Sequence, residues 1–271
     1  MPGLTAGPGA ELARSGRMNA LFTSERVDAA RSAATLFFAA AQPIAGQAAR
    51  LTGRGEPIEE QSAKAQSPVT PADGAFVIWA PLFAASLNYA ARAVARSDDP
   101  LIRRTGWLTA AAYAGDTAWE LWAQYRNVGW RSVAIIAATA GAANAAMLTA
   151  ARAEEDEPSR DLVLNSVAPL AGWLTVATAA NLGGARIAEG GPADRPAQTR
   201  VGVALTAAAA TAASVLSYAS RGNPFYAGAA AWGLGGVAVR NLRERNGPVL
   251  VAALAGLAAA AGATFAARRR A

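Results

Sequence analysis

Two acidic residues lie inside a long apolar stretch of the sequence. The segment AGDTAWELWAQY, residues 114–125, carries Asp116, Trp119 and Glu120 at spacings of three and four, so a helix presents all three on one face. Glu120 lies about five residues, or roughly 8 Å along a helix, from the end of the stretch at Tyr125. Two carboxylates in such surroundings need an approaching cation, or a proton on at least one of them. The pair is therefore a candidate polar anchor for a ligand, or a proton or cation site.

Two structural alternatives explain the same acids without a ligand. One acid could accept a hydrogen bond from Asn144 or Asn165 on a neighbouring helix, or could lie near the lipid headgroups. An acid inside an apolar segment is a functional candidate by default, so the residues alone leave both interpretations open.

A stripe of aromatic residues marks the segment TPADGAFVIWAPLFAASLNYA, residues 70–90. Phe76, Trp79, Phe83 and Leu87 recur at helical spacing and share one face. Such stripes usually pack against other helices or form an interfacial tryptophan belt. The functional alternative is the wall of a pocket for a flat, apolar ligand.

A second stripe lies in APLAGWLTVATAANLGG, residues 168–184. Pro169, Trp173, Ala177 and Asn181 recur every four residues on one face. The small alanine leaves a groove or permits close helix approach. Asn181 is a polar group within an apolar segment, so it needs a partner from another helix or from a ligand.

The residues that the chain lacks exclude most enzyme chemistry. It has no cysteine and no histidine, which removes disulfides, thiolate nucleophiles, imidazole bases, His-ligated haem and ordinary zinc sites. We therefore expect no catalytic residues, no metal and no required cofactor. A membrane enzyme acting on isoprenoids or porphyrins is the least favoured class, because SDDP (97–100) is the only aspartate-rich motif.

The composition indicates a membrane protein. Only 16% of the 271 residues are charged and 53% are hydrophobic, whereas soluble domains carry roughly 25% charge. The arginines lie between apolar runs instead of clustering, which is typical of loops beside spans and argues against a nucleic-acid partner. A soluble all-α protein is the alternative, but repeated uncharged runs of this length are rare outside lipid.

The apolar runs predict an all-α, polytopic bundle of seven or eight transmembrane helices. The first run is interrupted by Gln42, Pro43 and Gln47, and the count is seven if it does not cross. The expected spans are residues 32–49, 74–91, 105–125, 132–151, 162–185, 201–220, 222–239 and 247–267. With eight spans, the arginine and lysine distribution slightly favours both termini in the cytoplasm.

The remaining segments are predicted to lie outside the spans. Residues 1–31 carry glycine, proline and several charges without the apolar core of a signal peptide, so they are interpreted as a flexible tail. The link from Thr52 to Thr70 is too polar to cross a bilayer and is placed across one mouth of the bundle.

Three motifs together resemble the tryptophan-rich sensory protein family, also called translocator protein or peripheral-type benzodiazepine receptor. TPADGAFVIW is similar to the start of its second helix, GDTAW followed by RNVGWRSVAII to its third, and PLAGWLTVATAAN to its fifth. The chain departs from the family pattern where it has Gly74, Val77, Ile78, Asp116 and Val176. The resemblance covers residues 32–185 as a five-helix unit, followed by three additional helices over residues 201–267.

The resemblance implies a bundle that binds flat apolar molecules, such as tetrapyrroles and sterol-like or isoprenoid-like compounds, for sensing, transport or protection. It implies that Trp79, Trp119, Trp173, Ala177 and Asn181 line the pocket, and that a second copy forms a dimer. Without histidine, a porphyrin would be held by ring stacking and not through an axial iron ligand. A bacterial inner membrane is the expected setting. The alternative function is a proton-coupled secondary transporter that uses Asp116 and Glu120.

Overall fold

The computed structural model describes residues 8–154, 159–191 and 194–270, and side chains from residue 24 onward. Within these residues every regular element is a helix, which confirms the all-α prediction. The elements are α1 (Pro8–Ala45), α2 (Ala48–Thr52), α3 (Ile58–Lys64), the 3₁₀ helix η1 (Asp73–Ile78), α4 (Trp79–Ala95), α5 (Pro100–Tyr125), α6 (Trp130–Ala151), α7 (Arg160–Ala188), α8 (Arg195–Ala219), α9 (Pro224–Arg243) and α10 (Gly247–Arg268).

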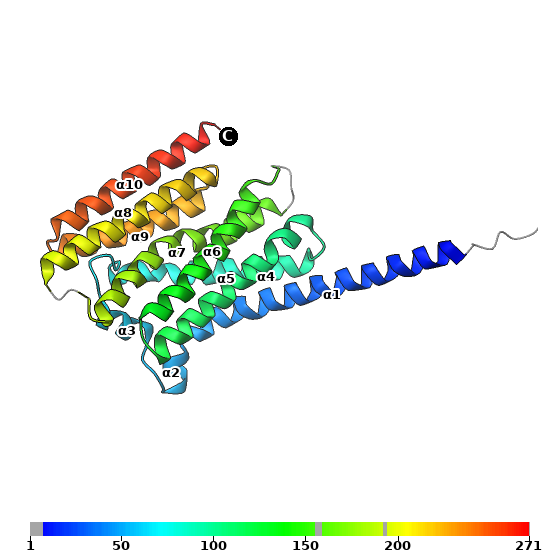
Figure 1. The fold of residues 1–271 in the computed structure, drawn as a ribbon, viewed down its shortest axis with the longest axis horizontal. Helices are drawn as coiled ribbons and strands as arrows, with labels where there is room; N and C mark the ends of the chain where they lie inside the picture. Colours follow the sequence, from blue (N-terminus) through cyan, green and yellow to red (C-terminus); the bar gives the residue numbers. More distant parts are fainter. Residues whose placement is uncertain (1–7, 155–158, 192–193, 271) are drawn as a thin grey trace, which may run out of the picture.

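The long helices form one bundle around α7. This helix packs against α4, α6, α8 and α9, while α5 lies between α1 and α6. The three C-terminal helices α8, α9 and α10 pack together on the opposite side of the bundle from α1, as Figure 1 shows. Helix α7 is accordingly the most enclosed of the apolar helices, with 72% of its most apolar window buried.

Five helices are long and apolar enough to cross a membrane. They are the segments Asp73–Ala95, Trp130–Ala151, Arg160–Ala188, Arg195–Ala219 and Gly247–Arg268. The helices that contain the three other predicted spans, α1, α5 and α9, are long enough, but their described residues are not apolar enough. In α5 the acids Asp116 and Glu120 lower the apolar character. Helices α5 and α9 each pack against other long helices of the bundle. That they cross the membrane with these neighbours stays a prediction.

The N-terminal segment differs from the expected tail. Residues 1–7 lie outside the described part of the chain, but α1 begins at Pro8 and runs without a break to Ala45. Figure 1 shows its first half extending well past the rest of the bundle. Alanine, leucine, glutamate and arginine dominate residues 10–14, and these are strong helix formers even where no partner helix covers them.

Helices α1 and α5 run parallel and are joined at both ends by polar contacts. At one end, Arg103 Nε donates to Asp28 Oδ2 at 2.9 Å and Arg31 Nη1 donates to Asp28 Oδ1 at 2.7 Å. The hydrogen bond from Arg103, with a further contribution from Arg31, holds the pKa of Asp28 below its usual value. At the other end, Gln124 Nε2 donates to the Ala45 carbonyl of α1 at 2.6 Å, and the Ala49 amide of α2 donates to Gln124 Oε1 at 2.8 Å. The later residue of α1 thus meets the later residue of α5, which shows that the two helices run in the same direction.

Candidate functional site

Five aromatic rings from three parts of the chain meet at one end of the bundle. Trp79 lies within 5.6 Å of Phe83 and 6.3 Å of Trp119 by ring centroids, and is roughly parallel to both. Trp173 meets Trp79 edge-on at 5.9 Å and Phe76 edge-on at 5.8 Å. Rings in these geometries attract one another beyond the area that they bury. The aromatic cluster, defined as these five residues, therefore has a fixed arrangement.

The helical spacing of the sequence places each ring. Phe76 is in η1, while Trp79 and Phe83 follow one turn apart on α4. Trp119 and Trp173 reach the same point from α5 and α7, and both are almost completely buried at 4% and 1% exposure. The first three rings are only partly buried. The cluster thus has a buried side and a side that faces a cavity.

That open side faces an outer cavity of about 330 Å³. Its wall combines Phe76, Trp79, Phe83 and Glu120 with polar residues of α3 and of the link before η1. Leu87, the fourth member of the aromatic stripe, does not line it and is 38% exposed on the outside of α4. The volume lies at the lower end of the range for small-molecule sites, roughly 300–1,000 Å³.

A much smaller inner cavity of about 40 Å³ lies behind Trp79. Trp119, Trp173, Ala177 and Asn181 line it, together with Phe76 and Trp79. This space accommodates water and no ring system. The residues expected to form one ligand pocket are therefore brought together, but they divide into an outer wall and an inner support.

Asn181 finds its partner on a neighbouring helix. The Trp119 indole Nε1 donates to Asn181 Oδ1 at 2.9 Å, Ser132 Oγ lies 3.4 Å from the same oxygen, and Asn181 Nδ2 donates to the Ala177 carbonyl at 3.0 Å. A bonded indole holds its ring in one orientation, so Asn181 positions Trp119. By contrast, the indole Nε1 of Trp173 is buried with no hydrogen-bond partner, and it is a free donor beside the inner cavity.

The two acids of α5 lie in different surroundings. Asp116 is 1% exposed, neither of its carboxylate oxygens has a hydrogen-bond partner, and it lines neither cavity. Glu120 is 2% exposed, lines the outer cavity and has no partner at Oε2. Asn144 donates instead to the Ala140 carbonyl at 2.8 Å and toward Thr175 at 3.5 Å. Among the described residues, neither acid therefore accepts the hydrogen bond from Asn144 or Asn165 that was one structural explanation for them.

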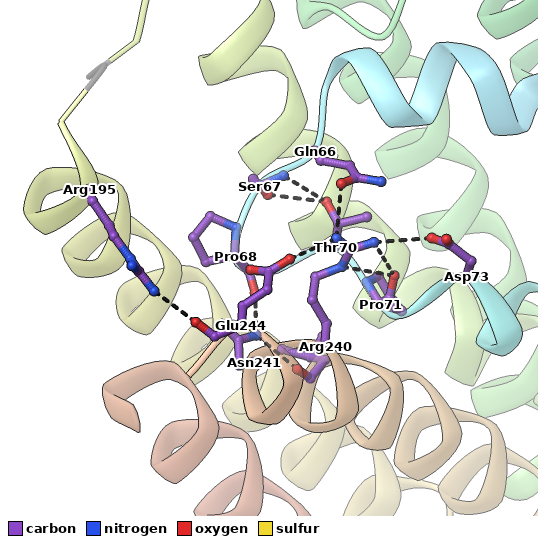
Figure 2. A network of polar contacts seen from close by, with 11 residues as sticks. Gln66, Ser67, Pro68, Thr70, Pro71, Asp73, Arg195, Arg240, Asn241 and Glu244 are labelled. Carbon is purple, nitrogen blue, oxygen red and sulfur yellow. Dashed lines mark hydrogen bonds and ion pairs between the residues drawn. The ribbon is translucent and has the colours of Figure 1, made fainter. Parts of the chain in front are cut away.

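The link between α3 and η1 covers the site and is held by α9. Arg240 is only 8% exposed, and Figure 2 shows its guanidinium pointing toward Pro71 and Asp73. It donates to Gln66 Oε1 at 3.0 Å, to Asp73 Oδ1 at 3.1 Å and to the Pro71 carbonyl at 3.4 Å. Asn241 Nδ2 adds a bond of 2.7 Å to the Pro68 carbonyl. Gln66, Thr70, Pro71 and Asp73 also line the cavities, so α9 fixes part of their walls.

Arg240 and Asn241 were not predicted as site residues. In the sequence they belong to RNLRERN, which lies between the predicted spans 222–239 and 247–267. The helix continues through this segment to Arg243, so both side chains project from α9 toward the link. The local signal in the sequence is an asparagine directly after an arginine at the end of an apolar run. This signal does not indicate which segment of the chain the two side chains contact.

The described residues at the site bring together five aromatic rings and few groups that could take part in chemistry. No group of three or more histidine, cysteine, aspartate or glutamate residues that could hold a metal ion occurs in the described part of the chain. The geometry offers ring faces, one carboxylate in the cavity wall and a cover joined to another helix.

A comparison with protein families gives one match. The model of the family described as TSPO-like protein matches residues 31–266, and so includes α8, α9 and most of α10. No curated protein and no solved structure matches the chain.

Proposed function

Because this chain belongs to the TSPO-like protein family, and is thus an integral, multi-pass membrane protein of the TspO kind, we propose that it binds a planar hydrophobic ligand in the outer cavity. The observation that carries the proposal is the aromatic cluster, whose rings Phe76, Trp79 and Phe83 line a space of about 330 Å³. The ligand class is tetrapyrrole-like, sterol-like or isoprenoid-like, and the role is sensing, transport or protection. A bacterial inner membrane as the setting and a second copy as partner belong to the same proposal.

The cavity sizes decide where the ligand lies. A ring system cannot enter the inner cavity of about 40 Å³ unless Trp79 moves. The ligand therefore lies against the open side of the aromatic cluster, and Trp119 and Trp173 support Trp79 from behind. Burial of aromatic rings against aromatic rings supplies most of the binding free energy.

We expect Trp79→Leu to weaken ligand binding by about tenfold, the loss typical of an aromatic anchor in a binding site. Protoporphyrin dimethyl ester, which has no ionised side chains, is titrated into the purified full chain in detergent while tryptophan fluorescence is followed. The wild-type protein should show saturable quenching, and the midpoint, not the amplitude, is compared because the variant lacks one fluorophore. Trp173→Leu should also shift the midpoint, through loss of support for Trp79.

Trp107→Leu is the matched control. Trp107 is 49% exposed on α5 and lines neither cavity, so the same chemical change there should leave the midpoint unaltered. Saturable quenching with one midpoint in the wild-type protein, Trp79→Leu and Trp173→Leu would refute the assignment of the cavity.

A second candidate function is a proton-coupled transporter, and Asp116 favours it. Both carboxylate oxygens of Asp116 are buried without a partner in the interior of α5, where an acid can take up and release a proton. In proteoliposomes containing trapped pyranine and placed in an acidic medium, protoporphyrin dimethyl ester should then accelerate proton entry. Asp116→Asn should abolish the acceleration, while Asp161→Asn, at the exposed start of α7, should keep it. A rate of proton entry that does not change when the ligand is added would exclude this function. Acceleration by the ligand that persists in Asp116→Asn would exclude it as well.

A further inference from the structure

We propose that Glu120 binds a protonated amine, so that the preferred ligands of the outer cavity are planar apolar molecules carrying a basic nitrogen. This inference rests on the proposed function, because it concerns the ligand of the same cavity. It adds the charge of the ligand, which neither the family nor the aromatic cluster determines.

The first observation is the charge of the cavity wall. Among the described residues, three acids line the outer cavity, Glu59, Asp73 and Glu120, and no lysine or arginine does. Glu59 pairs with Arg50 at 3.3 Å and Asp73 with Arg240 at 3.1 Å. Glu120 has no ion pair among the described residues, although the whole chain carries a net charge of +6. Glu120 is therefore the acid of the cavity wall for which a ligand can supply the positive partner.

The second observation is that several buried polar side-chain atoms near Glu120 have no hydrogen-bond partner among the described residues. Asp116 lies one turn earlier on α5 with both oxygens unpartnered. Gln42 on α1 is completely buried with both amide atoms unpartnered. Gln42 lies one turn before Gly46, whose Cβ position is 3.7 Å from the Gln42 carbonyl oxygen and 3.0 Å from Glu120 Oε1. Buried polar groups in folded proteins are nearly always hydrogen-bonded, so a set of this kind indicates a bonding partner that comes from outside.

The third observation is that the turn between α1 and α2 leaves space for the carboxylate. A Cβ atom at Gly46 would lie 3.0 Å from Glu120 Oε1, which is a very close approach. Gly46 also lines the outer cavity. The carboxylate is thus positioned at the cavity wall by the absence of a side chain opposite it.

The chemistry of the wall fits an organic cation better than other charged ligands. A protonated amine is attracted by a carboxylate and by the faces of Trp79, Phe76 and Phe83 in the same cavity. An anionic ligand would meet an unneutralised carboxylate, and like charges oppose binding. A divalent metal is disfavoured because the described residues contain no cluster of three or more suitable ligands.

Three anthracene probes with the same ring plane test the proposal. They are 9-(aminomethyl)anthracene, 9-anthracenemethanol and 9-anthracenecarboxylate, which are cationic, neutral and anionic at pH 7. Each is titrated into the purified full chain in detergent by energy transfer from tryptophan. We expect the cation to bind about tenfold more tightly than the neutral probe, and the anion to bind most weakly.

Glu120→Gln should remove the preference for the cation and leave the affinity for the neutral probe unchanged. Glu60→Gln is the control, because Glu60 is exposed on α3 and does not line the cavity. Equal affinities of the cationic and neutral probes for the wild-type protein would overturn the proposal, whether or not the variant folds. A preference that survives in Glu120→Gln would overturn it too. Absence of binding by all three probes would instead contradict the proposed function.

Discussion

Gly172→Ala is expected to destabilise the protein by about 2 kcal/mol or more, although the same change in a helix normally stabilises it. Gly172 lies where α7 meets α9, and an added Cβ would be 2.3 Å from the Tyr226 carbonyl oxygen and 3.1 Å from the Ala230 amide nitrogen. These are backbone atoms, which cannot rotate away as a side chain can. The methyl group must therefore push α7 and α9 apart.

The separation would disturb contacts that hold both helices. Tyr226 is completely buried, and its hydroxyl lies 3.1 Å from Thr175 Oγ1 of α7. Trp173, the neighbour of Gly172, belongs to the aromatic cluster. We thus expect a lower melting temperature in detergent together with weaker binding of protoporphyrin dimethyl ester.

Gly141→Ala in α6 is the matched control for this substitution. An added Cβ at Gly141 has no atom within 4 Å, so the change should raise stability by up to about 1 kcal/mol through helix propensity alone. The two variants should shift the melting temperature in opposite directions. A shift of the same sign in both would show that α7 and α9 are not in backbone contact.

Local sequence patterns predicted the apolar helices and the aromatic stripe of the second predicted span. Uncharged runs and helical spacing are local properties, so they placed Phe76, Trp79 and Phe83 on one face of the second predicted span. That Trp119 and Trp173 reach the same point from α5 and α7 came from the family resemblance, because periodicity does not specify which helices are neighbours. The structure brings the three indoles together, while their role in ligand binding stays a prediction.

The division of the site into two cavities could not be predicted. It depends on where the link between α3 and η1 crosses the end of the bundle, and this depends on contacts with a helix more than 150 positions later in the chain. Sequence analysis found no functional signal in the last three spans, since an arginine at the end of an apolar run resembles an ordinary helix boundary. The family match over residues 31–266 includes these helices, of which α9 contacts the link that lines the cavities.

The unpartnered acids Asp116 and Glu120 show a second limit of prediction from the sequence. Their spacing predicted that Asp116 and Glu120 share a face of α5, but only the tertiary structure separates their roles. Glu120 lines the outer cavity, and Asp116 lies one helical turn earlier on α5, buried and away from both cavities. Gln42, which sequence analysis regarded only as an interruption of the first span, is also buried and unpartnered.

Arg240→Met should release the cover of the site while leaving the bundle folded. Methionine keeps an apolar stem of similar length in α9, so the change removes mainly the guanidinium and its bonds to Gln66, Pro71 and Asp73. Asp73 is 88% exposed in its side chain, so its ion pair contributes little. The bonds to Gln66 and to the Pro71 carbonyl account for most of a loss of about 2 kcal/mol.

Amide hydrogen exchange over residues 66–75 measures this loss directly. The Ala72 amide donates to the Gly236 carbonyl at 2.9 Å, and its exchange should accelerate about thirtyfold, the factor that corresponds to 2 kcal/mol. Arg243→Met removes the same charge from the exposed side of the same helix turn and should leave this exchange unchanged. Since the link supplies Gln66, Thr70 and Asp73 to the outer cavity, ligand affinity should fall with the loss of protection in Arg240→Met. Unaltered protection in that variant would mean that the link is held by its own packing, and that α9 has no part in closing the site.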